Sequence, residues 1–132
     1  MQTWLQIGDD VDVRVLSPLT LAYVGDAVFE LYVRTQLAGQ GGKIQQMHQA
    51  TVRYVNAEAQ KDILFSWEPH LDEEELAVVR RGRNAKGTVP RNADTISYRQ
   101  STGFEALVGF LFLTGRNERL GWLLQLVQPT NE

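Results

Sequence analysis

The sequence predicts an all-α protein, a bundle of five to six or more helices. In most of its longer segments apolar side chains recur three and four positions apart, which is the spacing of one helical face. Residues that cap helix N-termini precede several of these segments, and Gly or Pro follows them. The 132 residues are 43% hydrophobic and 22% charged, as in an ordinary globular protein. We therefore expect residues 1–132 to form a single domain.

Residues 1–16 are expected to be a loosely ordered lead-in to this bundle. Within it Val11, Val13 and Val15 alternate with charged residues, a pattern that predicts one short extended edge. The stretch has three aspartates and no basic leader before an apolar block, so it does not look like a secretory signal.

The first helix is expected over residues 18–38. Ser17 can accept a hydrogen bond from a free backbone amide, and Pro18 suits the first helical position because it has no amide to satisfy. A glycine-rich stretch, residues 39–42, ends the helix. The positions expected to face inward are Leu21, Val24, Val28, Leu31 and Tyr32.

Residues 43–67 have a helical composition, and Asn56 could break the segment in two. Pro69 ends it. The expected inward positions are Met47, Val52, Val55, Ala59, Ile63 and Leu64. Asp72 and the three glutamates after it then predict a new helix start, because an aspartate cap and acids in the first turn both favour the helix dipole.

The most basic part of the chain follows that helix. Residues 80–99 hold six cations and one acid, a local net charge of +5, whereas the whole chain carries −3 and the remainder therefore −8. Cations are expected at a helix C-terminus, but here they continue into a Gly- and Pro-punctuated loop. This asymmetry predicts a phosphate-binding surface. The residues predicted to contact the polyanion are Arg81, Arg83, Asn84, Lys86, Arg91 and Arg99.

Two further helices are expected, over residues 95–114 and 118–127. Asp94 can cap the first, whose second half is apolar on most sides. Such a helix is either the central one of a bundle or pairs with a second subunit. The second is amphipathic and stops before Pro129, with Leu120, Leu123, Leu124 and Val127 facing inward.

Composition excludes several classes of site. Cysteine is absent, so the chain has no disulfide framework and no cysteine-based zinc site. The two histidines, His48 and His70, lack the spacing of metal ligands. The longest apolar run, 104–113, is about half of what a membrane crossing needs and contains Glu105. We therefore expect a cytoplasmic protein.

Two carboxylates stand inside apolar helical runs, and each has glycine beside it. Asp26 follows Gly25, and Glu105 lies between Gly103 and Gly109. Small residues let helices approach closely, so the two acids could converge on one Mg²⁺ ion. The residues alone leave a structural alternative equally open, in which Asp26 pairs with a core arginine and Glu105 forms a hydrogen bond.

Glu30 lies one turn after Asp26 on the same face. It could support the site, but it more plausibly pairs with Arg34, four residues further on.

The residues around these acids resemble two motifs of the ribonuclease III family. Leu21–Ala27, Leu-Ala-Tyr-Val-Gly-Asp-Ala, followed by Phe29 and Glu30, looks like the signature of its catalytic domain. Phe104–Gly109, Phe-Glu-Ala-Leu-Val-Gly, looks like its second carboxylate motif. The Arg-Gly-Arg-Asn-Ala-Lys run at 81–86 and the short chain, without room for a double-stranded-RNA-binding domain, are similar to the Mini-III ribonucleases.

The chain also departs from the full-length members of that family. They place glutamates seven and four residues before the signature aspartate and an aspartate three residues before the second glutamate. This chain has Leu19, Ala22 and Thr102 at those positions. Of the usual metal ligands only Asp26 and Glu105 remain, so a bound ion would be rich in water.

The resemblance implies an endoribonuclease with a ribonuclease III-like catalytic domain. Asp26 and Glu105 would be the catalytic residues and would hold Mg²⁺, with Mn²⁺ as a substitute. The implied substrate is double-stranded RNA, with large-subunit (23S) ribosomal RNA precursor as the physiological one, and the products carry 5′-phosphate and 3′-hydroxyl ends. It also implies a homodimer in which each site cuts one strand. The rival readings are a noncatalytic RNA-binding module and a helical protein-interaction module.

Overall fold

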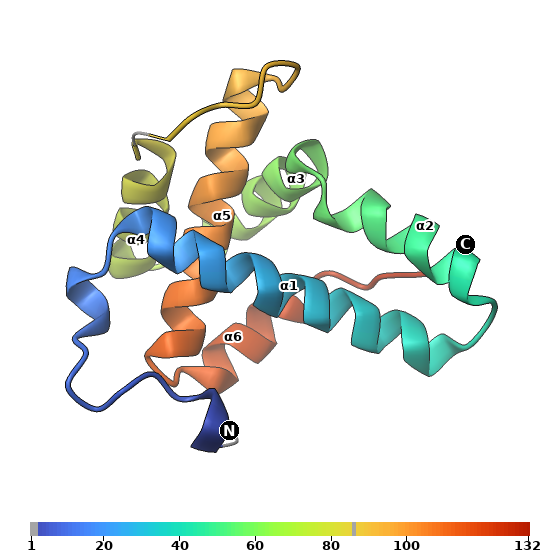
Figure 1. The fold of residues 1–132 in the computed structure, drawn as a ribbon, viewed down its shortest axis with the longest axis horizontal. Coiled ribbons are helices and arrows are strands. Elements are labelled where there is room, and N and C mark those ends of the chain that lie inside the picture. Colours follow the sequence, from blue (N-terminus) through green and yellow to red (C-terminus); the bar gives the residue numbers. More distant parts are fainter. Residues whose placement is uncertain (1–2, 86) are drawn as a thin grey trace.

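The computed structural model describes residues 3–85 and 87–132, and within them the chain forms six α-helices and no strand (Figure 1). This confirms the all-α prediction. The helices are α1 (Pro18–Gln40), α2 (Ile44–Val55), α3 (Ala57–Trp67), α4 (Glu73–Arg83), α5 (Thr95–Leu113) and α6 (Asn117–Leu124). Short 3₁₀ helices lie at Thr3–Leu5, Val13–Val15 and Glu68–His70.

Local sequence explains where these helices begin and end. The Ser17 hydroxyl accepts the amide of Thr20 at the start of α1, and Gly41 ends the helix with a positive φ of 79°. Asn56 breaks the second helical segment as expected, because its side chain accepts the amide of Ala59 and so starts α3. At α4, Asp72 and Glu75 exchange hydrogen bonds in a capping box.

Helix α5 is the central helix, which is one of the two possibilities that its apolar second half left open. It crosses behind α1 in Figure 1 and packs against α1, α3, α4 and α6. Phe104 fills the middle of the core, with its ring 4.9 Å from those of both Phe29 and Trp67. The largest fully buried apolar side chains come from α1, α3, α5 and α6, namely Phe29, Leu21, Leu37, Leu64, Trp67, Phe104, Leu107, Leu111 and Leu123.

Glycines set how closely α1 and α4 approach α5. A Cβ added to Gly25 would lie 1.8 Å from the carbonyl oxygen of Glu105, and one added to Gly109 would lie 1.9 Å from that of Leu21. The helix backbones therefore touch at this crossing. A second pair, Gly82 of α4 and Gly103 of α5, makes a similar crossing, with 2.7 Å between the added Cβ of Gly82 and the Cα of Gly103.

The structure corrects two expectations about which residues face inward and one about local backbone conformation. Leu31 and Val52 are each 62% exposed. On α1 the buried stripe is instead Leu21, Gly25, Phe29, Val33 and Leu37. Val13–Val15 forms a 3₁₀ turn rather than an extended edge, because the Asp12 side chain accepts the amide of Arg14.

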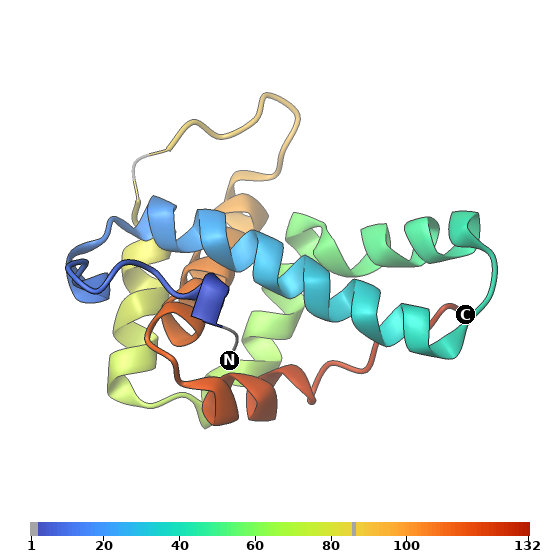
Figure 2. The same ribbon diagram turned by 60° about the horizontal axis from the view of Figure 1, so that its bottom comes forward.

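The second half of α1 and all of α2 form an arm that extends away from α5 (Figures 1 and 2). The C-terminal residues run back along this arm. The side chain of Gln40 donates to the carbonyl of Pro129 at 2.6 Å, and Arg53 donates to that of Glu132 at 2.8 Å. Over the described ranges, no helix is long and apolar enough to cross a membrane.

Candidate active site

Asp26 and Glu105 come together where α1 crosses α5. Asp26 is exposed in the middle of α1, and Glu105 is half-buried on the α5 face that meets it. The backbone contact at Gly25 and Gly109 brings the two helices close enough for the two carboxyl groups to lie within hydrogen-bonding reach. Two acids almost 80 positions apart in sequence therefore share one site.

This arrangement changes the acidity of Glu105. Burial, together with the hydrogen bond and the negative charge of Asp26, raises the pKa of Glu105 from 4.5 to about 8. The amide of Gln60 acts in the opposite direction, because it donates to the carboxylate. Without a cation Glu105 therefore keeps its proton at neutral pH, because its ionised form would be half-buried beside a second acid.

The two carboxylates offer the kind of donors that suit Mg²⁺, which prefers oxygen ligands and keeps much of its water. In the described part of the chain no group of three or more His, Cys, Asp or Glu side chains converges on a point. Ala22 and Thr102, one turn from the two acids, are buried, and the Thr102 hydroxyl donates to the carbonyl of Tyr98. A divalent ion that replaces the proton of Glu105 fits this donor set.

Sequence reasoning missed one residue of this site, Gln60. It lies on α3 and is 1% exposed, and its Nε2 donates to Oε2 of Glu105 at 3.5 Å. The sequence pattern could have predicted that Gln60 is buried, because it falls on the same helical face as two apolar residues, Leu64 and Trp67.

Two alternatives from the sequence can be tested against the ion pairs. Glu30 pairs with Arg34 at 2.9 Å, as its spacing predicted. Asp26 forms no ion pair with any residue that the structure describes, so the pairing with a core arginine is not found.

The predicted RNA-binding residues lie around the end of α4, the loop after it and the first turns of α5. Arg83 packs its Cγ against Gly103, two residues before Glu105, so the base of the loop lies close to the carboxylates. Arg99 donates to the carbonyls of Arg83 and Ala85 at 3.5 Å and ties α5 to the end of α4. Arg81 donates to the carbonyl of Leu16 at 3.3 Å.

Asn84 and Arg91 are exposed in the same region, and Lys86 lies outside the described residues. Figure 2 shows the loop between α4 and α5 standing clear of the helices. None of the four described arginines pairs with an acid among the described side chains, which leaves their positive charge available to an anion.

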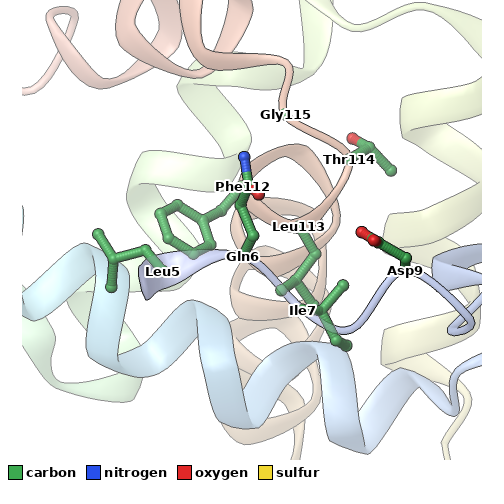
Figure 3. Close-up of a pocket in the computed structure, with 8 residues that line it drawn as sticks. All are labelled: Leu5, Gln6, Ile7, Asp9, Phe112, Leu113, Thr114 and Gly115. Atoms are coloured by element: carbon green, nitrogen blue, oxygen red, sulfur yellow. The ribbon is translucent and has the colours of Figure 1, made fainter. Parts of the chain in front are cut away.

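A cavity of about 310 Å³ lies elsewhere, between the N-terminal segment and the end of α5 (Figure 3). Leu5, Ile7 and Asp9 line one side of it, and Phe112 and Thr114 the other. Its lining contains neither Asp26 nor Glu105, and none of the predicted RNA-binding residues that the structure describes. The two carboxylates instead lie at the molecular surface, where Asp26 is exposed on α1. A site at the surface can act on a polymer that lies across the protein.

Comparison with known proteins agrees with the geometry. A model of the ribonuclease III domain matches residues 19–116. The chain is 53% identical over 112 residues to the Mini-ribonuclease 3 of Symbiobacterium thermophilum, covering 83% of this chain and 86% of the relative. It is 51% identical over 113 residues to the Mini-ribonuclease 3 of Desulfitobacterium hafniense, covering 85% of this chain and 72% of the relative.

The fold also matches a crystal structure of a protein from Fusobacterium nucleatum. The TM-score is 0.80 at 31% sequence identity, and the match covers 87% of this chain and 93% of the other.

Proposed function

The chain belongs to the ribonuclease III family and is an endoribonuclease, and from this premise we propose that it cuts double-stranded RNA by Mg²⁺-dependent hydrolysis. The observation that carries the proposal is the meeting of Asp26 and Glu105 at the α1–α5 crossing. Two facing acids, one of them half-buried with its pKa raised to about 8, favour the binding of a divalent cation.

Asp26 and Glu105 would hold the metal, with Mn²⁺ able to replace Mg²⁺. When bound, such an ion lowers the pKa of a water that can attack phosphorus and offsets negative charge on the phosphoryl oxygens. The two carboxylates would hold the ion in place, and water and RNA phosphate would supply its remaining ligands. The proposed products carry 5′-phosphate and 3′-hydroxyl ends.

RNA binding is assigned to Arg81, Arg83, Asn84, Lys86, Arg91 and Arg99. A-form RNA is recognised largely through phosphates and 2′-hydroxyls, which suits exposed cations and an amide better than a pocket that reads bases. The arginines among them that the structure describes form no ion pair with a described acid. One of them, Arg83, contacts Gly103, which lies two residues before Glu105 in α5. The same contacts would hold the duplex over the carboxylates.

We further propose that the protein works as a homodimer. Leu19, Tyr23, Ala27 and Leu31 recur every four residues along α1, and all four are exposed beside Asp26. An apolar stripe on a helix in water favours burial against a partner, and a second copy would bring a second carboxylate pair to the opposite RNA strand.

The proposed substrate is the precursor of large-subunit (23S) ribosomal RNA, which implies a cytoplasmic protein. Residues 1–132 are proposed to act as a single catalytic domain. In support, residues from Val13 to Val127 contribute to one hydrophobic core.

The test is a cleavage assay on a perfect RNA duplex and on single-stranded RNA, with and without Mg²⁺. We expect cleavage of the duplex only, and only with Mg²⁺. Asp26→Asn and Glu105→Gln should each lower the cleavage rate at least about 1,000-fold, because each removes a negatively charged ligand of the metal that would stabilise the transition state. Circular dichroism should show that both variants stay folded.

A matched control is Glu30→Gln, which removes a carboxylate one turn from Asp26 that is already paired with Arg34. It should cleave at nearly the wild-type rate. Wild-type turnover in Asp26→Asn would refute the catalytic assignment. RNA binding without scission in the wild-type protein would point instead to a noncatalytic binding module.

A further inference from the structure

Gln60 is a polar side chain buried in the core beside the carboxylates. It is 1% exposed and lies on the α3 face that also buries Leu64 and Trp67. Placing an amide there costs free energy unless its hydrogen bonds are made, and an apolar residue of similar volume would avoid that cost. Its presence therefore calls for a role that a leucine or methionine could not fill.

The partner of the buried amide indicates that role. Nε2 of Gln60 donates to Oε2 of Glu105 at 3.5 Å, and among the described side chains no other makes a hydrogen bond to this carboxylate except Asp26. The contact is long, as active-site hydrogen bonds often are before substrate binds. Because the amide engages one carboxylate oxygen, it restricts rotation of the Glu105 side chain beside Asp26.

The position of α3 makes this restraint rigid. Leu64 and Trp67, one and two turns after Gln60, are fully buried, and the Trp67 ring packs against Phe104, the residue next to Glu105. The helix that carries the amide and the helix that carries the carboxylate are thus held by the same aromatic contact. An orienting group is effective only when its own position is fixed in this way.

We infer that Gln60 is a positioning residue that holds the Glu105 carboxylate in the orientation that binds the divalent cation. The inference rests on the proposed function, because it assumes that Asp26 and Glu105 form the cation site. Groups that orient a ligating side chain through a hydrogen bond typically contribute about 10- to 100-fold to metal affinity. Gln60 needs no contact with the cation or with RNA to do this.

The experiment measures Mn²⁺ binding to the metal-free protein without RNA, by electron paramagnetic resonance of the free ion. Gln60→Met keeps the length of the side chain and removes the amide, and Gln60→Leu is a second variant of similar volume. Both should fold, and both should bind Mn²⁺ about 10- to 100-fold more weakly than the wild type. Far-ultraviolet circular dichroism and urea unfolding establish that each variant is folded under the assay conditions.

Thr51→Val is the matched control. Thr51 is 5% exposed on α2, and its hydroxyl donates to the carbonyl of Met47 within the same helix. This change also replaces a buried polar group with an apolar one, but away from the carboxylates, and it should leave Mn²⁺ affinity unchanged. A loss of affinity in Thr51→Val equal to that in Gln60→Met would overturn the inference, because any buried polar substitution would then have the same effect.

Asp26→Asn separates the inference from the function on which it rests. If Asp26→Asn abolishes Mn²⁺ binding and folded Gln60→Met or Gln60→Leu binds within twofold of the wild type, Gln60 does not position Glu105 and only the inference fails. If Asp26→Asn binds Mn²⁺ like the wild type, the cation site itself is misplaced and both fail.

Discussion

Glu75 is buried and Glu105 is half-buried, and the side chains around them give these two glutamates different roles. Glu75 is 1% exposed, and the guanidinium of Arg119 donates to both of its carboxylate oxygens at 2.8 Å. Glu105 instead faces a second acid, Asp26, and its pKa rises to about 8. The charge of Glu75 is already neutralised by an arginine, whereas the two facing acids have no positively charged partner among the described side chains. The contrast supports Glu105, and not Glu75, as a functional carboxylate.

Glu75 gives a prediction about stability. Arg119→Ala should lower the free energy of unfolding at pH 7 by about 3 to 5 kcal/mol, because it leaves a buried carboxylate without its partner. The control is Arg14→Ala, which breaks the exposed ion pair with Glu74 and should cost less than about 1 kcal/mol. Urea unfolding of the three proteins measures both values. If Arg119→Ala and Arg14→Ala both lower the free energy of unfolding by the same small amount, Arg119 does not neutralise Glu75.

The same pair predicts how stability depends on pH. Burial alone would raise the pKa of Glu75, but the hydrogen bonds from Arg119 and the amide of Asp72, with the charges of Arg119 and Arg116, lower it below 4.5. The folded state then holds the carboxylate ionised where the unfolded chain has begun to bind a proton. Its stabilising contribution is therefore full above about pH 4.5 and is lost as the pH falls through the folded pKa. The difference between wild type and Arg119→Ala should shrink over that range.

At the scale of the helices, the α1–α5 crossing gives a second prediction. Gly25→Ala would place a Cβ 1.8 Å from the carbonyl oxygen of Glu105, so the helices must move apart. Such overpacking typically costs about 1 to 3 kcal/mol, and the displacement should also separate the two carboxylates. We expect lower stability in urea unfolding and a larger loss of RNA cleavage than the change in stability explains.

Gly39→Ala is the control on the same helix. Nothing lies within 4 Å of a Cβ added there, and the backbone is helical. This change should stabilise the protein by up to about 1 kcal/mol and leave cleavage unchanged, because alanine favours the helix more than glycine does. If Gly25→Ala behaves like Gly39→Ala, the helices do not meet through their backbones.

Sequence reasoning predicted the helices well, because caps and breakers act locally. The Ser17 cap, the Asn56 break and the Asp72 cap all act within one turn and are where the sequence placed them. The buried face of α1 was less predictable, because that helix has apolar residues on more than one side. Leu31 was expected inside and is 62% exposed.

The site was predictable in part. Asp26 and Glu105 stood out because each is an acid in an apolar run beside glycine, and glycine is what a close helix crossing needs. Gln60 did not stand out, because a single glutamine in an amphipathic helix is usually on the outside. Only the three-dimensional packing of α3 against α5 reveals that its amide faces Glu105.

At the scale of the whole molecule, one chain supplies one carboxylate pair, whereas an RNA duplex has two strands to cut. The exposed apolar stripe of α1 lies beside that pair, with Tyr23 81% exposed next to the turn that carries Asp26. A two-fold axis through the stripe would bury the same surface of both copies and set two sites facing one groove of a duplex. Assembly and double-strand cleavage are therefore expected to depend on the same residues.

The last prediction follows from that dependence. Tyr23→Glu combined with Leu31→Glu places like charges on the stripe, which should convert a dimer into a folded monomer in sedimentation equilibrium. Leu126→Glu is the control, since Leu126 is 42% exposed after α6 and not part of the α1 stripe. It should leave the dimer intact. A monomeric wild-type protein, or a charged variant that stays dimeric, would contradict the α1 interface. If α1 forms the interface, the double variant Tyr23→Glu/Leu31→Glu should no longer cut both strands of a duplex in one binding event. Asp26, Glu105 and Gln60 are unchanged in it, but a monomer has no second site to face the other strand.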